Sequence, residues 1–284
     1  MKNNINYKVL AVIPVILTII SGIFVYTHGL KESIDVSGGT EITITVPNNN
    51  VDINKLKEAL PEGVEVKQSS SAYGTFIIID AGKEANIEKI EETLKKFFNV
   101  DDLNELQYSQ KQIGASLSEK FWKDGFKAVG FAFLFMAIVV YLVFRTPVPS
   151  GAVVLAALSD IIMAVGGMSL FEIPVSTATV AALLMLLGYS VDTDIMLTTR
   201  VLKRRVGTLD ERIKGAMKTG ITMSLTTIVA MLVLYIVVTY IVPAAGILKN
   251  ISAVILFGLI ADLMTTWMTN VGILKYYVLE YKKK

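Results

Sequence analysis

The chain has 284 residues, of which 53% are hydrophobic and only 18% are charged, and its formal net charge is +2. Its mean hydropathy of +0.56 is too high for an ordinary globular domain, so the composition indicates a membrane protein. The sequence has no cysteine, which excludes disulfides, thiolate nucleophiles and Cys-ligated metals. It also lacks a nucleotide-binding loop, a metal-ligand cluster and a nucleophile with its base, so we expect no enzyme, cofactor, metal ion or nucleic-acid partner.

Six segments are apolar and near the ~20 residues that a helix needs to span a bilayer. In chain order they are residues 9–26, 126–144, 151–170, 175–199, 219–242 and 251–277. The first resembles a signal peptide, but its apolar core is long and no cleavage site follows it. We therefore interpret it as an uncleaved anchor and predict a membrane α-helical protein with six transmembrane helices.

The basic residues predict the orientation of these spans. Lysines and arginines gather in residues 200–218, at Arg145 and in residues 282–284, and the positive-inside rule places all of them in the cytoplasm. The prediction is therefore a multi-pass protein of the cell membrane with both termini cytoplasmic. Its expected parts are an N-terminus with the first span (1–29), an external domain (30–122) and a five-helix domain (123–284) with a cytoplasmic basic loop at 200–218.

The segment between the first two spans is patterned like a soluble domain. Alternating apolar residues predict strands at 40–46, 64–68, 75–81 and 103–110, and helical spacing predicts helices at 53–60 and 87–98. The order β-α-β-β-α-β is that of a ferredoxin-like α+β fold, in which two helices cover one face of a four-stranded sheet. The open face suits docking to a partner, although a small self-sufficient domain is equally consistent with this length.

Two aspartates lie inside the fourth span, counted from Arg200 at its cytoplasmic end. Asp192 is about 12 Å and Asp194 about 9 Å from that end, and they point about 200° apart around the helix. Asp160 in the third span lies at a similar depth, about 13 Å. Because a carboxylate at a helix centre costs at least about 2.5 kcal/mol, such residues usually face the bundle interior and carry protons or ions. We favour Asp192 as the proton carrier, keep Asp194 and Asp160 as candidates, and leave Asp262 unassigned.

Further polar side chains occur at the same depth. The fifth span carries a hydroxyl stripe at i, i+3 and i+7, which we interpret as hydrogen bonding helices together rather than as carrying ions. The supporting positions on the fifth and fourth spans are Thr219, Thr222, Thr226, Tyr189, Ser190 and Thr193.

Two motifs give the chain a family resemblance that covers nearly its whole length. The run DVSGGT, residues 35–40, matches the Asp-x-x-Gly-Gly-Thr signature that opens the first external domain of SecF proteins. Residues 158–201, from LSDIIMAVGG to DIMLTTRV, resemble the third and fourth spans of the same family, with Asp160 at an acidic position. The chain thus resembles the SecF subunits of the SecDF complex of the Sec export machinery, in particular the archaeal members.

The resemblance implies a role and several partners. SecF pairs with SecD in a twelve-span assembly of the RND (resistance–nodulation–division) type, which helps secreted polypeptides cross the membrane at the translocon with the proton-motive force. The expected partners are therefore SecD, the translocon, secreted polypeptides and membrane lipids. In the signature Asp35, Gly38, Gly39 and Thr40, the two glycines suit either a hinge to the external domain or a tight turn or bulge at the entrance of the sheet.

The chain also departs from the family pattern. Bacterial SecF proteins usually read Gly-Tyr-Ser-x-Asn-Asp-Thr, which puts the family's acid at Thr193 and its asparagine at Asp192, whereas RND transporters align their first acid with Asp192. Bacterial members also tend to have an arginine where Thr219 stands. Two alternatives therefore stay open: half of an RND-type exporter of lipids or small molecules, and a scaffold for SecD and the translocon that does not couple to protons.

Overall fold

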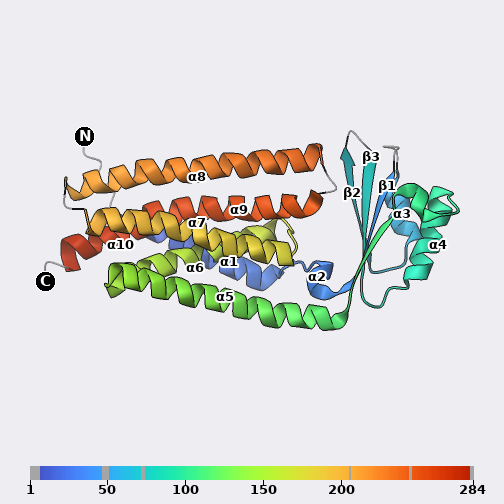
Figure 1. Ribbon diagram of the computed structural model, residues 1–284, viewed down its shortest axis with the longest axis horizontal. Helices are drawn as coiled ribbons and strands as arrows, with labels where there is room; N and C mark the ends of the chain where they lie inside the picture. Colours follow the sequence, from blue (N-terminus) through green and yellow to red (C-terminus); the bar gives the residue numbers. More distant parts are fainter. Residues whose placement is uncertain (1–6, 47–50, 72–73, 205, 243–244, 282–284) are drawn as a thin grey trace.

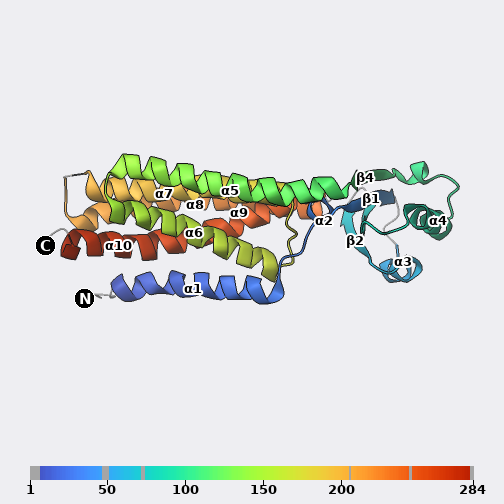
Figure 2. The same cartoon turned by 90° about the horizontal axis from the view of Figure 1, so that it is seen from below.

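The structure is a computed structural model that describes residues 7–46, 51–71, 74–204, 206–242 and 245–281. It consists of a long helical bundle with a small α/β domain at one end (Figure 1). The beginning of the first helix and the end of the last one lie together at the opposite end of the bundle (Figures 1 and 2). The predicted basic end at 282–284 lies outside the described residues.

Six helical segments are long and apolar enough to cross a membrane, which confirms the six predicted spans. The last of them is continuous but changes its winding partway. The spans are α1 (Tyr7–His28), α5 (Ala115–Phe144), α6 (Pro147–Leu170), α7 (Thr177–Leu202), α8 (Leu209–Tyr240) and the run of α9 (Gly246–Met264), η3 (Thr265–Asn270), α10 (Val271–Tyr276) and η4 (Tyr277–Tyr281).

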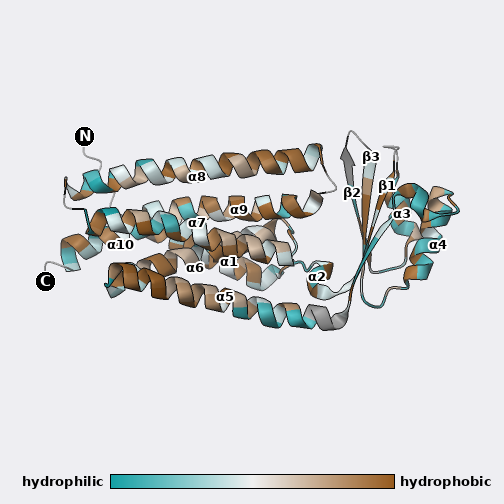
Figure 3. Cartoon of the chain, viewed as in Figure 1, coloured by the Kyte–Doolittle hydropathy of each residue, from teal (hydrophilic) through white to brown (hydrophobic). Residues whose placement is uncertain are grey.

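Figure 3 shows that these helices consist mainly of hydrophobic residues, whereas hydrophilic residues gather on the α/β domain and at the helix ends. Large apolar side chains such as Ile19, Phe135 and Val233 are exposed on the outer helices. Helices α1, α5 and α8 are the most exposed spans, and α6, α7 and α9 are the most buried. Figure 2 shows α1 at the edge of the bundle, where it packs beside α6. Polar groups inside α6, α7 and α9 are therefore shielded by protein rather than by lipid.

Helices α8 and α5 begin well before the apolar runs that predict them. Helix α8 starts at Leu209 because Thr208 and Glu211 form a reciprocal capping box, so Arg212, Lys214 and Lys218 lie on the helix rather than in a loop. The connection to α7 is thus limited to residues 203–208. Helix α5 starts at Ala115 and runs through the predicted boundary at 122–123, so the bundle and the α/β domain share this helix.

The α/β domain has the predicted ferredoxin-like fold. Its strands are antiparallel in the order β2-β3-β1-β4, and two helices cover one face. The elements are β1 (Gly39–Val46), α3 (Ile53–Ala59), β2 (Val64–Ser71), β3 (Gly74–Ala81), α4 (Ile87–Phe98) and β4 (Ser109–Ile113). The core between sheet and helices is fully buried and consists largely of Ile42, Ile44, Leu56, Ile77, Ile79, Ile90 and Leu94.

The last strand differs from its prediction. The residues expected to begin it form a single 3₁₀ turn, η1 (Leu103–Leu106), and β4 follows at 109–113. The side chain of Asp102 accepts a hydrogen bond from the Asn104 backbone and caps this turn. Leu103 and Leu106 are both buried, which is the i, i+3 spacing of a 3₁₀ turn rather than the alternation of a strand.

The helix-free face of the sheet points toward the end of the bundle, not into open solvent (Figure 1). A cavity of about 310 Å³ lies between them, lined by Glu41, Thr43 and Phe76 of the sheet and by Ser176 and Lys249 of the helix ends. Desolvation in this position raises the pKa of the Glu41 carboxyl. The expectation of an exposed sheet face free for a partner is therefore wrong for this part of the face.

Candidate functional site

Three carboxylic acids meet in the middle of the bundle. Asp160 on α6, Asp194 on α7 and Asp262 on α9 each have 0% exposure. Helices α7 and α9 approach closely at Gly258, where a Cβ atom would lie only 2.1 Å from Leu186 Cδ2. A larger residue at this position would hold the two acid-bearing helices apart.

Asp160 is held by two hydroxyl groups from the neighbouring helices. Ser190 Oγ on α7 donates to its Oδ2 at 2.5 Å, and Thr265 Oγ1 donates to its Oδ1 at 2.5 Å. Both carboxyl oxygens thus have a hydrogen-bond partner, as buried polar atoms usually do.

Asp194 and Asp262 lie close to one another and share a hydroxyl partner. Thr266 Oγ1 is 2.9 Å from Asp194 Oδ1 and 2.9 Å from Asp262 Oδ1. Asn270 Nδ2 also donates to Asp194 Oδ1, at 2.6 Å. The second oxygens of both acids, and the amide oxygen of Asn270, have no hydrogen-bond partner among the described residues.

A local change of helix winding brings these partners to the acids. The segment η3 is a π-helical turn, in which the Val271 N–H bonds to the Thr266 carbonyl five residues earlier. Thr265, Thr266 and Asn270 all lie on this turn, and all three are buried. π-helical turns inside longer helices often occur at functional sites. Here the turn lets Thr265 reach Asp160 while Thr266 reaches the acid on α7.

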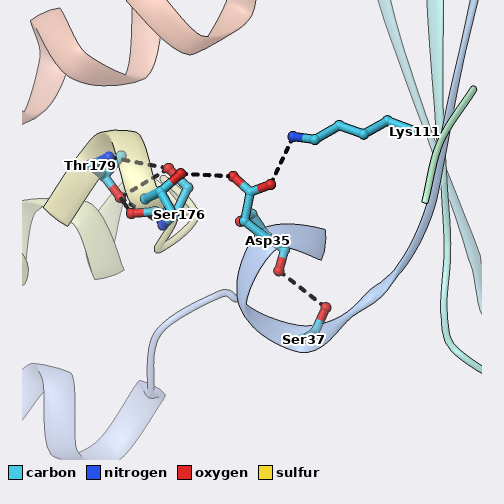
Figure 4. Close-up of polar contacts among 7 residues, drawn as sticks. Asp35, Ser37, Lys111, Ser176 and Thr179 are labelled. Carbon is cyan, nitrogen blue, oxygen red and sulfur yellow. Dashed lines mark hydrogen bonds and ion pairs between the residues drawn. The ribbon is translucent and has the colours of Figure 1, made fainter. Parts of the chain in front are cut away.

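A second polar junction links the α/β domain to the bundle (Figure 4). Asp35 lies on the short helix α2 (Ile34–Ser37), where its Oδ1 accepts from Lys111 Nζ on β4 at 2.8 Å. Its Oδ2 accepts from Thr177 Oγ1, in the first turn of α7, at 3.3 Å. The hydrogen bond to Asp35 raises the pKa of Lys111. Asp35 therefore connects the sheet to the helix that carries Asp194.

Comparison with known proteins gives the family. The family model described as "Protein export membrane protein SecD/SecF, C-terminal" matches residues 92–280. The SecF proteins of Methanocaldococcus jannaschii and Methanothermobacter thermautotrophicus are 57% and 46% identical, and the alignments cover 98% and 96% of this chain and 98% and 93% of theirs. The chain belongs to the SecD/SecF family.

Solved structures of low sequence identity share the fold. The crystal structure of SecDF from Thermus thermophilus matches 98% of this chain with a TM-score of 0.71 at 21% identity. This SecD/SecF-family chain spans 38% of the length of that SecDF chain. A heavy metal efflux pump matches 93% of this chain and 46% of its own length, with a TM-score of 0.55 at 11% identity.

The structure brings only some of the predicted site residues of this SecD/SecF-family chain together. Asp160, Asp194 and Ser190 are in the buried cluster, whereas Asp192 faces outward on α7, as does Tyr189 with 40% exposure. Thr193 is buried but its hydroxyl bonds to the Tyr189 carbonyl of its own helix. The predicted depths are similar, but only the direction around the helix decides which acid faces the interior.

The predicted threonine stripe stays on the surface of α8. Thr219, Thr222 and Thr226 donate to carbonyl oxygens of their own helix at 3.2, 2.8 and 2.7 Å. The side chains of Thr222 and Thr226 are exposed on the surface of α8. Within the described residues, these hydroxyls therefore bond neither the carboxylic acids nor a neighbouring helix.

The sequence analysis left Asp262 unassigned and missed its neighbours on the last span. Asp262, Thr265, Thr266 and Asn270 follow one another at i, i+3, i+4 and i+8, which places them on one face of a helix. This polar face within an apolar span is the signal that could have found them. Among the described residues, no group of three or more His, Cys, Asp or Glu side chains is arranged to hold a metal ion.

The two glycines of the signature have positive φ angles, +74° at Gly38 and +137° at Gly39. A Cβ on Gly39 would lie 2.3 Å from the Ala81 carbonyl oxygen of β3. The next residue, Thr40, is buried and pairs with Ala81. This geometry is that of a tight entrance into β1, and a hinge at these glycines stays a prediction.

We expect Asp35→Asn to weaken the junction between sheet and bundle. The amide keeps the volume but loses the charge that pairs with Lys111, and a partly exposed ion pair contributes about 0.5–1 kcal/mol. Amide hydrogen exchange in the first turn of α7 should therefore be about two- to fivefold faster. Asp102→Asn, which removes a carboxylate far from α7, is the control. Equal amide hydrogen exchange in the two variants would show that Asp35 does not stabilise the junction between the sheet and α7.

Proposed function

We propose that this chain is the SecF subunit of a SecDF-type complex, and that it assists Sec-dependent protein export across the cell membrane with the proton-motive force. Membership of the SecD/SecF family supports the export role. The observation that supports proton coupling is the cluster of three carboxylic acids at the middle of the bundle.

The cluster suits uptake and release of protons. None of its acids forms an ion pair with a Lys, Arg or His side chain among the residues that the structure describes. An unpaired carboxylate is costly in this environment, and protonation removes that cost. A proton that crosses 100 mV supplies about 2.3 kcal/mol, which shifts a two-state equilibrium by more than tenfold.

The outward face of α7 supports SecD as the partner. Ala181, Met185, Gly188 and Asp192 are exposed and follow a helical stripe at i, i+4, i+7 and i+11. An aspartate on this stripe is costly against lipid, whereas small residues allow close approach of another helix. We therefore assign this stripe to the SecD interface of a twelve-span assembly of the RND type.

Further parts of the proposal follow from the fold. Both ends of the described chain lie at the end of the bundle opposite the α/β domain, which supports cytoplasmic termini and an external domain. The translocon and secreted polypeptides would then be met on the outer face, and lipids would surround α1, α5 and α8. The junction at Asp35 would pass a change at Asp194 along α7 to the external domain.

The test compares export with and without an imposed proton gradient in Asp194→Asn. The amide keeps the side-chain volume and removes the titration, so assembly with SecD should persist while the gradient-dependent stimulation is lost. Asp192→Asn should instead weaken copurification with SecD, and Asp101→Asn, on the exposed surface of the α/β domain, is the neutral control. Full gradient-dependent stimulation of export in Asp194→Asn and in the Asp192→Asn/Asp194→Asn double variant would contradict proton coupling. The scaffold role would then be the remaining interpretation.

A further inference from the structure

Thr266 lies between two buried acids that come from different helices. Its hydroxyl oxygen is 2.9 Å from an oxygen of Asp194 and 2.9 Å from an oxygen of Asp262. A hydroxyl group carries one hydrogen, and an ionised carboxylate carries none. If both acids were ionised, one of the two contacts would bring two oxygen atoms together with no hydrogen between them. One further proton on the pair gives each of the two contacts its own hydrogen.

The position of Asn270 indicates which acid carries this proton. Its amide nitrogen donates to the same Asp194 oxygen that contacts Thr266, at 2.6 Å. An ionised carboxylate is the stronger acceptor, because hydrogen bonds to charged groups are about twice as strong as neutral ones. The resting arrangement is then a protonated Asp262 that donates to Thr266, which in turn donates to an ionised Asp194.

Unpartnered buried atoms also point to protons at this site. Asn270 Oδ1, Asp194 Oδ2 and Asp262 Oδ2 are acceptors without a partner among the described residues, and all three side chains have 0% exposure. The Asn270 side chain reaches into the cluster, since its nitrogen contacts Asp194. Buried acceptors are stabilised by hydrogens, so the site can take up an additional proton.

No basic side chain among the described residues pairs with these two acids, and one further acid lies beside them. The only other acid that faces the pair from α6 is Asp160, and its two oxygens already accept from Ser190 and Thr265. On α7, α8 and α9, no Lys, Arg or His among the described residues forms an ion pair or hydrogen bond with these acids. The shared hydroxyl is thus the direct connection between Asp194 and Asp262.

We propose that Thr266 is a proton bridge between Asp194 and Asp262. In one step, the O–H bond of Asp262 breaks and its hydrogen binds Thr266 Oγ1, while the hydrogen of Thr266 moves to Asp194 Oδ1. The products are an ionised Asp262, an intact threonine and a neutral Asp194, so no atom or charge is lost. No side chain has to move, because Thr266 Oγ1 already lies at hydrogen-bond distance from both carboxyl oxygens.

The bridge deepens the proposed function and rests on it, and the test uses the full chain in membranes together with SecD. Thr266→Val keeps the shape and removes the hydroxyl, so gradient-dependent export should fall on the order of 100-fold, the lower end for a positioned proton-transfer group. Thr266→Ser should stay within a few-fold of wild type. The matched control is Thr269→Val on the same turn, whose hydroxyl bonds to the Ala11 carbonyl of α1 and not to an acid.

Infrared spectroscopy gives a second readout that does not depend on export. The carbonyl band of a protonated carboxyl group should be present in the wild type near neutral pH, shift in Thr266→Val and disappear in Asp262→Asn. If Thr266→Val fails to assemble with SecD, the infrared spectra of wild type and Asp262→Asn are compared instead. A carbonyl band that is unchanged in Asp262→Asn overturns the proton bridge. Equal export in Thr266→Val and Thr269→Val also overturns it. The proposed proton coupling fails by a different result, namely full gradient-dependent stimulation of export in Asp194→Asn.

Discussion

Gly39→Ala is expected to destabilise the α/β domain strongly. The added Cβ would lie 2.3 Å from the Ala81 carbonyl oxygen, which is backbone of the neighbouring strand and cannot rotate away. The φ angle of +137° is in addition unfavourable for any residue with a side chain. Relief requires breaking the β1–β3 pairing, so we expect a loss of about 3 kcal/mol or more from a domain whose total stability is about 5–15 kcal/mol.

Protease sensitivity of the α/β domain, measured on the full chain in membrane vesicles, checks this expectation. Gly63→Ala is the matched control, because Gly63 also has a positive φ of +85° but has no atom within 4 Å of the added Cβ. This control should lose only about 1 kcal/mol from backbone strain. Equal resistance of both variants to protease would show that the close approach at Ala81 does not limit the fold.

Gly258→Ala is expected to destabilise the bundle and to uncouple the carboxyl cluster. Its Cβ would lie 2.1 Å from Leu186 Cδ2 and 2.5 Å from Cδ1, and Leu186 is fully buried. Overpacking of this kind costs about 1–3 kcal/mol. If α7 moves away from α9 by 1 Å, the contact of Thr266 with Asp194 lengthens beyond hydrogen-bond distance. Gradient-dependent export and the thermal midpoint should both fall.

The double variant Gly258→Ala/Leu186→Ala tests the mechanism. Removing the leucine side chain makes room for the new methyl group, so the double variant should be more stable than the sum of the two single changes predicts. Gly151→Ala on α6 is the control, since a Cβ there meets no atom within 4 Å. Additive losses in the double variant would show that Leu186 is not the group that the methyl displaces.

The spans and the α/β fold could be predicted because local pattern determines them. The alternation Ile42, Ile44 and Ile77, Ile79 marks one buried sheet face, and the long apolar runs mark the spans. The ends of α8 and η1 differed because a capping box and a capped 3₁₀ turn outweighed the apolar pattern. Such contacts extend a helix beyond its membrane part without changing hydropathy.

The cluster could be predicted only in part. Depth along the chain identified Asp160 and Asp194, but it does not say which face of α7 is turned inward, and the favoured residue was Asp192. The inward face depends on long-range packing, such as the close contact of Leu186 on α7 with Gly258 on α9. The polar spacing on the last span indicates a common face, but the π-helical turn at 265–270 changes which acid each residue reaches, and a regular helical period does not anticipate that change.

The length of α5 constrains how the α/β domain can move. This helix has 30 residues, which at 1.5 Å each gives about 45 Å, whereas the hydrocarbon layer is about 30 Å thick. About ten residues of α5 therefore extend beyond the hydrocarbon layer as a continuous helix. Only Gly114 separates this helical extension from β4. Because the connection is this short, a change in the orientation of the α/β domain is expected to tilt α5. The lipids around α5 would then experience the movement as a change of helix tilt.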